Sequence, residues 1–164
     1  MKNKIKKIAT ALLAFTVGCV SLTGCNVRQD TIRFGAAGVG GGYYAFATAY
    51  TQLANAEDAE MKFNIKSPAG SMANLRLLSE GYVDVAIAQA DLATAAYYGT
   101  DEKGESYQGY RVLAGLYTEA CQIVVRKDSG IKSLDDLQGK TVSIGEAESG
   151  TERNALQILQ VSGL

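Results

Sequence analysis

The chain has 164 residues, with 16 Lys and Arg against 17 Asp and Glu, a formal net charge of −1, and no histidine. A near-neutral chain without a basic patch is not typical of nucleic-acid-binding proteins, so no nucleic acid is expected as a partner. The absence of histidine removes the most common general base and metal ligand. We therefore expect no catalytic residue, no metal site and no cofactor.

Residues 1–24 are predicted to be a bacterial lipoprotein signal peptide. Four lysines lie within the first seven residues, and the apolar stretch Ile8–Val20 is too short to span a bilayer comfortably. The following Leu22-Thr23-Gly24-Cys25 resembles a lipobox, in which the cysteine thiol accepts the lipid. We expect cleavage before Cys25 and an extracytoplasmic protein that is lipid-anchored to the cell membrane. The alternative is an ordinary signal peptide with an incidental Cys25.

The mature chain would contain 140 residues, enough for one domain of ordinary size. Its 12 basic and 17 acidic residues give a net charge of about −5, since four basic residues leave with the signal. Cys19 is removed with the signal and Cys25 is lipidated, which leaves Cys121 alone. No internal disulfide is therefore expected.

Residues 25–30 form a short tether, and short apolar runs then alternate with helical patterns. The pattern predicts strands over 31–35, 61–66 and 83–88, each followed by a helix, over 43–55, 71–79 and 91–98. Such alternation is typical of an α/β domain with a largely parallel sheet.

The second half of the chain has shorter elements. Residues 99–108 are polar and predict a surface loop, and apolar, β-branched runs predict strands over 110–117, 121–126 and 140–144. Two pairs at capping-box spacing, Ser133 with Asp136 and Ser149 with Glu152, predict a short helix and a helix over 152–161.

The glycine-rich turn Gly35–Gly42 joins a predicted strand to a helix. Such a helix begins with unpaired N–H groups and a partial positive charge, which suit a small anion, and Tyr43 or Tyr44 could either reach over a ligand or pack in the core. Gly40–Ala45 also fits a loose dinucleotide fingerprint, but no acidic residue ends the second strand, so this interpretation is disfavoured. A purely structural turn is the remaining alternative.

Three further strand-to-helix junctions carry small polar residues. They contain Ser71 with Asn74, Gln89 with Asp91, and Ser149-Gly150-Thr151. Ligands of open α/β sheets bind beyond the carboxyl ends of the strands, where these junctions lie. Ser71 could instead only cap its helix, and Asp84 fits a turn or strand edge better than a ligand contact. No junction places a base beside a nucleophile, so the pattern favours binding of a small carboxylate over catalysis.

Taken in order, several motifs resemble the TAXI solute receptors, the extracytoplasmic binding subunits of one class of TRAP (tripartite ATP-independent periplasmic) transporters. The resemblance covers nearly the whole mature chain. It rests on Ile32–Tyr44, Gly70-Ser71-x-x-Asn74-Leu75, Gly81-x-x-Asp84-x-Ala86-x-x-Gln89-x-Asp91, Ser129-Gly130-Ile131-x-Ser133-Leu134-x-Asp136-Leu137-x-Gly139-Lys140 and Ser149-Gly150-Thr151.

The resemblance implies a type II periplasmic-binding-protein fold with two lobes, of which this chain would hold lobe one (31–118) and the crossover with the start of lobe two (119–164). The second lobe would be incomplete, and the chain would be a fragment of a longer receptor. Implied ligand contacts are Gly42, Tyr43, Ser71, Asn74, Gln89, Ser149, Gly150 and Thr151.

The implied function is a receptor, without enzyme activity, that delivers glutamate, glutamine or a dicarboxylate-like solute to a TRAP-type membrane permease. Two alternatives remain within the lipid-anchored class: an ABC-type or sensory solute-binding lipoprotein, and an anchored fragment that binds nothing.

Overall fold

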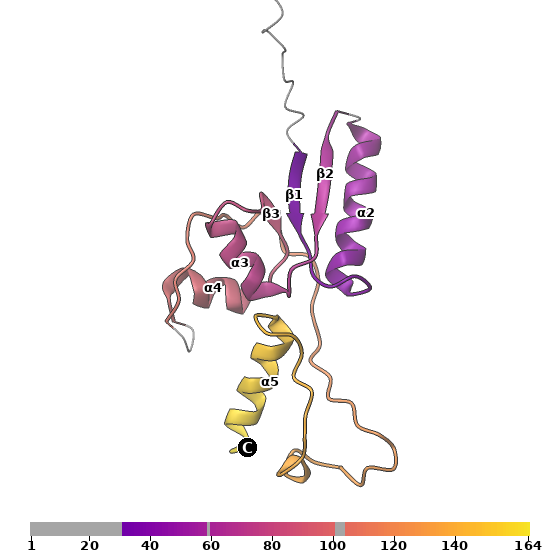
Figure 1. Cartoon of the computed structure of the whole chain (residues 1–164), viewed down its shortest axis with the longest axis vertical. Helices are drawn as coiled ribbons and strands as arrows, with labels where there is room; N and C mark the ends of the chain where they lie inside the picture. Colours follow the sequence, from indigo (N-terminus) through magenta and orange to yellow (C-terminus); the bar gives the residue numbers. More distant parts are fainter. Residues whose placement is uncertain (1–30, 59, 101–103) are drawn as a thin grey trace, which may run out of the picture. The chain divides into compact units, whose positions relative to one another are not determined.

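The computed structural model describes residues 31–58, 60–100 and 104–164 (Figure 1). The predicted signal peptide, Cys25 and the tether lie outside these ranges. None of the helices within them is long and apolar enough to cross a bilayer. The elements in chain order are β1 (Thr31–Gly35), α2 (Gly42–Glu57), β2 (Lys62–Lys66), α3 (Ser71–Ser79), β3 (Val85–Ala86), α4 (Ala90–Tyr98), the 3₁₀ helix η1 (Asp135–Leu137) and α5 (Gly150–Val161).

Three parallel strands form a sheet in the order β2–β1–β3. β1 pairs with β2 over five residue pairs and with β3 over two, Phe34–Val85 and Gly35–Ala86. Parallel strands need a crossover connection, and here helices α2 and α3 supply it. The predicted α/β class with a parallel sheet is confirmed, and all three strands end at the same edge of the sheet.

The main core lies between the sheet and α2, which run side by side in Figure 1. The ring of Tyr50 on α2 meets Phe34 of β1 and Phe63 of β2 edge to face, at centroid distances of 5.9 and 6.0 Å. Such aromatic pairs stabilise a fold beyond the area that they bury. The buried residues of this core are Phe34, Ala36, Ala47 and Ile87.

A second core joins α3 to α4. Met72 and Leu75 of α3 and Ala96 of α4 are buried, with Leu92, Tyr107 and Tyr110 packed around them. Leu78, which follows Leu75 at helical spacing, is only half-buried.

Glycines in the left-handed conformation follow two of the helices. Gly81 follows α3 with φ +73°, and Gly99 caps α4 with φ +65°. A left-handed residue at this position satisfies the last carbonyls of a helix, and glycine adopts it without strain. The helices predicted over 43–55, 71–79 and 91–98 are confirmed, with ends shifted by no more than two residues.

The strands predicted over 110–117, 121–126 and 140–144 are wrong. These segments have no regular secondary structure, and apolar side chains such as Val112, Leu113 and Val124 are more than 80% exposed. A β-branched run becomes a strand only beside another strand, and the three-stranded sheet of the described ranges does not reach these segments. The strand predicted over 83–88 is likewise reduced to Val85–Ala86, because only these residues pair with β1.

The two capping predictions have different outcomes. Ser149 caps α5, since its hydroxyl accepts a hydrogen bond from Glu152 N at 3.0 Å. The helix expected after Ser133 is instead the single 3₁₀ turn η1. There the Asp136 carboxylate accepts hydrogen bonds from the backbone N–H and hydroxyl of Ser133, at 2.9 and 3.1 Å, so it closes a turn and starts no longer helix.

Candidate functional site

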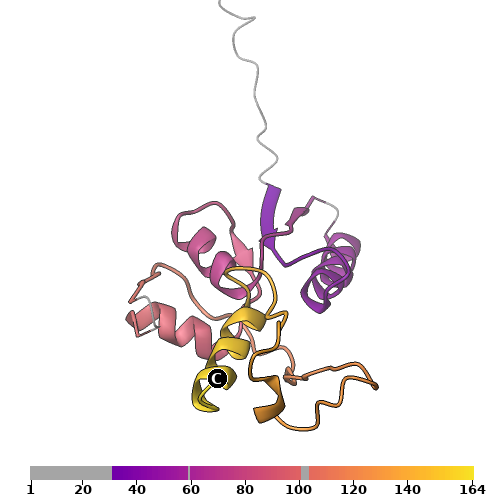
Figure 2. The ribbon, with the colours of Figure 1, turned by 60° about the horizontal axis from the view of Figure 1, so that its bottom comes forward.

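The carboxyl ends of the strands lead directly into α2, α3 and α4, and the start of α5 lies against the start of α3 (Figures 1 and 2). A Cβ placed on Gly70 would lie 3.2 Å from the Ser149 Cα. This close approach brings together junctions that are 79 positions apart in the sequence. The predicted ligand contacts of both halves therefore share one region.

Ser71, Gln89, Ser149 and Gly150 form the tightest part of this region, which we call the junction cluster. Ser71 is 1% exposed and Ser149 is 7% exposed. The Ser71 hydroxyl accepts a hydrogen bond from Gln89 N at 3.1 Å. A Cβ on Gly150 would overlap the Gln89 side-chain oxygen and would lie 3.0 Å from Ser71 Oγ, so a larger residue here would require the Gln89 side chain to move.

Asn74 lies behind the cluster, at the end of the sheet. Its fully buried amide nitrogen donates hydrogen bonds to the carbonyl oxygens of Ala36 (2.6 Å), Ile87 (2.7 Å) and Gly35 (3.3 Å). A Cβ on Gly35 would lie 2.6 Å from Asn74 Oδ1, so this glycine of the predicted turn makes room for the amide. The side chain of Asn74 thus ties α3 to the ends of β1 and β3, and its contact with a ligand stays a prediction.

Gly42 and Tyr43 begin α2 on the other side of the region. Gly41, the N-cap residue, provides no side-chain cap, and Gly42 is exposed. The Tyr43 hydroxyl donates a hydrogen bond to Glu119 Oε2 at 2.7 Å. Burial is the main cause that raises the pKa of the Tyr43 phenol far above its ordinary value; the Ser71 hydroxyl opposes this and the Glu119 carboxylate adds to it. Tyr43 therefore stays a neutral hydrogen-bond donor.

Thr151 and Asp91 occupy the rim. Thr151 is exposed. Its Cβ lies 3.0 Å from the position that a Cβ would take on Gly145, so the Thr151 side chain packs over that glycine. Asp91 is exposed in the first turn of α4 and lies outside the junction cluster. Of the eight predicted contacts, four form the cluster, Asn74 supports it, and Gly42, Tyr43 and Thr151 lie around it.

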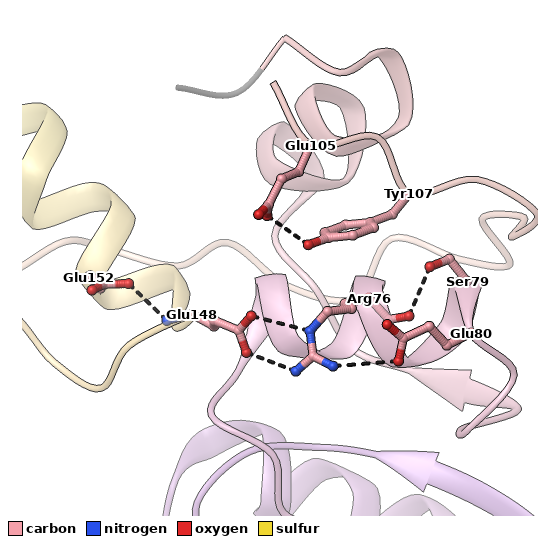
Figure 3. A network of polar contacts seen from close by, with 7 residues as sticks. All are labelled: Arg76, Ser79, Glu80, Glu105, Tyr107, Glu148 and Glu152. Atoms are coloured by element: carbon pink, nitrogen blue, oxygen red, sulfur yellow. Dashed lines mark hydrogen bonds and ion pairs between the residues drawn. The ribbon is translucent and has the colours of Figure 1, made fainter. Parts of the chain in front are cut away.

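Two charged residues that the motifs did not indicate connect the halves of the region (Figure 3). Arg76 on α3 donates to the carboxylate of Glu148 through Nε (3.2 Å) and Nη2 (2.9 Å). Glu148 also has φ +64°, the only positive φ of a non-glycine residue in the described ranges. No sequence signal marks this position, because glutamate is not a residue that favours the left-handed region.

A tyrosine borders the same network. The Tyr107 hydroxyl donates to Glu105 Oε2 at 2.7 Å (Figure 3). Burial, with a smaller contribution from Glu105, raises the pKa of Tyr107 to about 12. In the described ranges no three side chains of the Cys, His, Asp and Glu types are placed to hold a metal ion together.

Comparison with known protein families gives a match over most of the chain. The model of the NMT1-like family matches residues 34–164, a stretch that contains every junction described above. This family is part of the periplasmic solute-binding protein superfamily, with which the parallel sheet and its following helices are compatible. The chain therefore belongs to the NMT1-like family, whose role is extracytoplasmic solute binding.

Proposed function

We propose that this chain is the solute-binding receptor of a TRAP-type secondary transporter, of the TAXI kind, and that its ligand is a small carboxylate such as glutamate, glutamine or a dicarboxylate. The observation that carries the proposal is the convergence of the strand-to-helix junctions on one region. Ser71 and Gln89 from one half meet Ser149 and Gly150 from the other.

The start of α2 is the most suitable place for the ligand carboxylate. Its first-turn amides carry the partial positive charge of a 16-residue helix, and no side chain caps them. Gly42 lets an anion approach the backbone closely. The Tyr43 hydroxyl lies at the same end of the helix and donates its hydrogen to Glu119 Oε2, so it would have to leave Glu119 to donate to a ligand.

The hydroxyls of the region are arranged for binding rather than catalysis. Ser71 Oγ accepts from the Gln89 backbone, and Ser149 Oγ accepts from the Glu152 backbone. Among residues 31–58, 60–100 and 104–164, no carboxylate or other side-chain base is hydrogen-bonded to either hydroxyl, as it would be to an activated nucleophile. This supports a receptor without enzyme activity.

The membrane anchor on Cys25 fits the same proposal. A receptor held on the membrane by lipid is confined near a permease in that membrane, which raises its effective concentration there. The neighbouring genes distinguish the alternatives: a large fused permease gene supports the TRAP assignment, whereas a gene for an ATPase supports an ABC-type receptor.

Isothermal titration of the purified chain with L-glutamate, L-glutamine and succinate tests the proposed function. We expect saturable binding of at least one of them, and weaker binding after Ser71→Ala and Thr151→Ala. The matched controls are Ser143→Ala and Thr141→Ala, since both residues are exposed. Absence of binding to all three solutes contradicts the proposed ligand class, and unchanged affinity in both variants removes Ser71 and Thr151 from the site.

A further inference from the structure

The residues proposed to hold a ligand hold one another in this structure. Ser71 Oγ accepts a hydrogen bond from Gln89 N, and Gly150 lies so close to the Gln89 side chain that a Cβ on Gly150 would displace it. Ser71, Ser149 and Gly150 are all buried. A ligand can therefore touch these residues only after the start of α5 moves away from the start of α3.

The start of α3 is also occupied by a protein group. The backbone carbonyl of Glu148 accepts hydrogen bonds from the N–H groups of Met72 and Ala73, at 3.1 and 3.2 Å. These are first-turn amides of α3, which otherwise attract an anion such as a carboxylate. The Glu148 carbonyl thus provides the partial negative charge that a ligand oxygen would bring.

Glu148 is held in this place by side chains on both sides. Its carboxylate forms the two-point ion pair with Arg76 on α3, and its backbone N–H donates to Glu152 Oε2 on α5 at 2.8 Å (Figure 3). Its left-handed backbone, at φ +64°, costs free energy for a residue other than glycine. These contacts together must compensate for that cost.

We propose that Glu148 is a built-in competitor of the ligand. Its carbonyl occupies the amides of Met72 and Ala73, and the ion pair with Arg76 keeps the start of α5 closed over Ser71 and Gln89. The inference rests on the proposed function and adds its regulation: the ligand gains these contacts only when the Glu148 contact opens.

The competition has a measurable consequence. When only the open form binds, the apparent dissociation constant is the intrinsic one divided by the open fraction. The ion pair is partly exposed, with 33% of the Arg76 and 38% of the Glu148 side chain accessible, so its contribution is modest. We expect its removal to tighten ligand binding by roughly two- to fivefold.

The experiment compares the full lipidated chain in detergent micelles with its Arg76→Gln and Glu148→Gln variants. The control Arg126→Gln removes the same charge from the exposed pair Arg126–Asp128. Two quantities are measured: the affinity for L-glutamate, L-glutamine and succinate, and the hydrogen exchange of the Met72 and Ala73 amides. Far-UV circular dichroism and the urea midpoint establish that each variant is folded.

The proposal is supported when both amides exchange faster and the ligand binds more tightly in both variants. The control Arg126→Gln should show neither change. The proposal is overturned when the amides keep their protection in the variants, or when they exchange faster while affinity falls or stays the same. If no form binds any of the solutes, the proposed function fails, and the exchange of Met72 and Ala73 alone decides whether the ion pair holds Glu148 in place.

Discussion

The carboxylate of Asp84 accepts three hydrogen bonds from Arg33, from its backbone N–H at 2.8 Å, from Nε at 2.9 Å and from Nη2 at 2.6 Å. The backbone N–H of Asp84 donates in return to the carbonyl of Arg33 at 2.8 Å. These four bonds lie just before β3 and fix its register against β1. The expectation that Asp84 is a strand-edge residue rather than a ligand contact agrees with this geometry.

The Arg33–Asp84 pair predicts how stability depends on pH. The Arg33 guanidinium and backbone N–H lower the pKa of Asp84 from 3.8 to about 2. Because the folded pKa lies below the unfolded one, the stabilisation is complete above pH 3.8 and is lost as the pH falls toward 2. Both side chains are more than one third exposed, so we expect the loss to be about 1 kcal/mol. Urea unfolding between pH 6 and pH 2 measures it.

The variant Asp84→Asn provides the control for this pH prediction. It lacks the titrating group, so its stability at pH 6 should already be lower and should fall less between pH 4 and pH 2. An identical pH dependence in the variant and the wild type would show that other carboxylates cause the acid sensitivity.

Replacement of Asn74 by alanine is expected to destabilise the fold by about 2 to 4 kcal/mol. The change leaves three backbone carbonyls without their side-chain donor at a buried position. Urea denaturation gives the difference in free energy of unfolding. Asn64→Ala on the exposed side of β2 is the matched control, with an expected effect below about 0.5 kcal/mol. Equal effects in both variants would contradict the structural role of Asn74.

Gly150→Ala should separate the start of α5 from the start of α3. The added methyl group overlaps the Gln89 side chain, although alanine is otherwise the better helix former. We expect faster hydrogen exchange at Met72 and Ala73, whose amides contact the segment before α5. Gly38→Ala is the control, because a Cβ there has no atom within 4 Å and its φ is not positive. Unchanged protection in Gly150→Ala would mean that Gln89 moves aside without cost.

The proposed membrane anchor is tested by Cys25→Ala. Without the thiol no lipid can be attached, so the chain should move from the membrane fraction to the soluble fraction after cell lysis. Cys121→Ala is the matched control, since that exposed thiol is expected to have no part in anchoring. A Cys25→Ala protein that stays in carbonate-washed membranes would disprove lipidation at this residue.

The first half of the fold was predictable because its signals are local. The helix over 71–79 and the strand over 31–35 each depend on residues close in sequence. The segments 110–117 and 121–126 have equally strong β-propensity. They failed as strands because pairing requires a neighbouring strand, which propensity does not reveal.

In the candidate site, too, residues with local sequence signals were predicted and residues that depend on distant contacts were not. The motifs indicated Ser71, Gln89 and Gly150, which the structure brings together. They gave no indication of Arg76 and Glu148, because an ion pair between residues 72 positions apart leaves no local pattern. The lobe boundaries and the assignment of individual ligand contacts stay predictions.

The irregular segment 111–130 determines where proteases reach the folded chain. Every residue from 111 to 130 is exposed, and the segment contains Arg111, Arg126 and Lys127, three sites at which trypsin cuts. Exposed backbone without regular hydrogen bonding fits readily into a protease active site. A cut here divides the polypeptide between the part with the sheet and the part with α5. The lifetime of the intact protein outside the cytoplasm would then depend on how well this segment is covered.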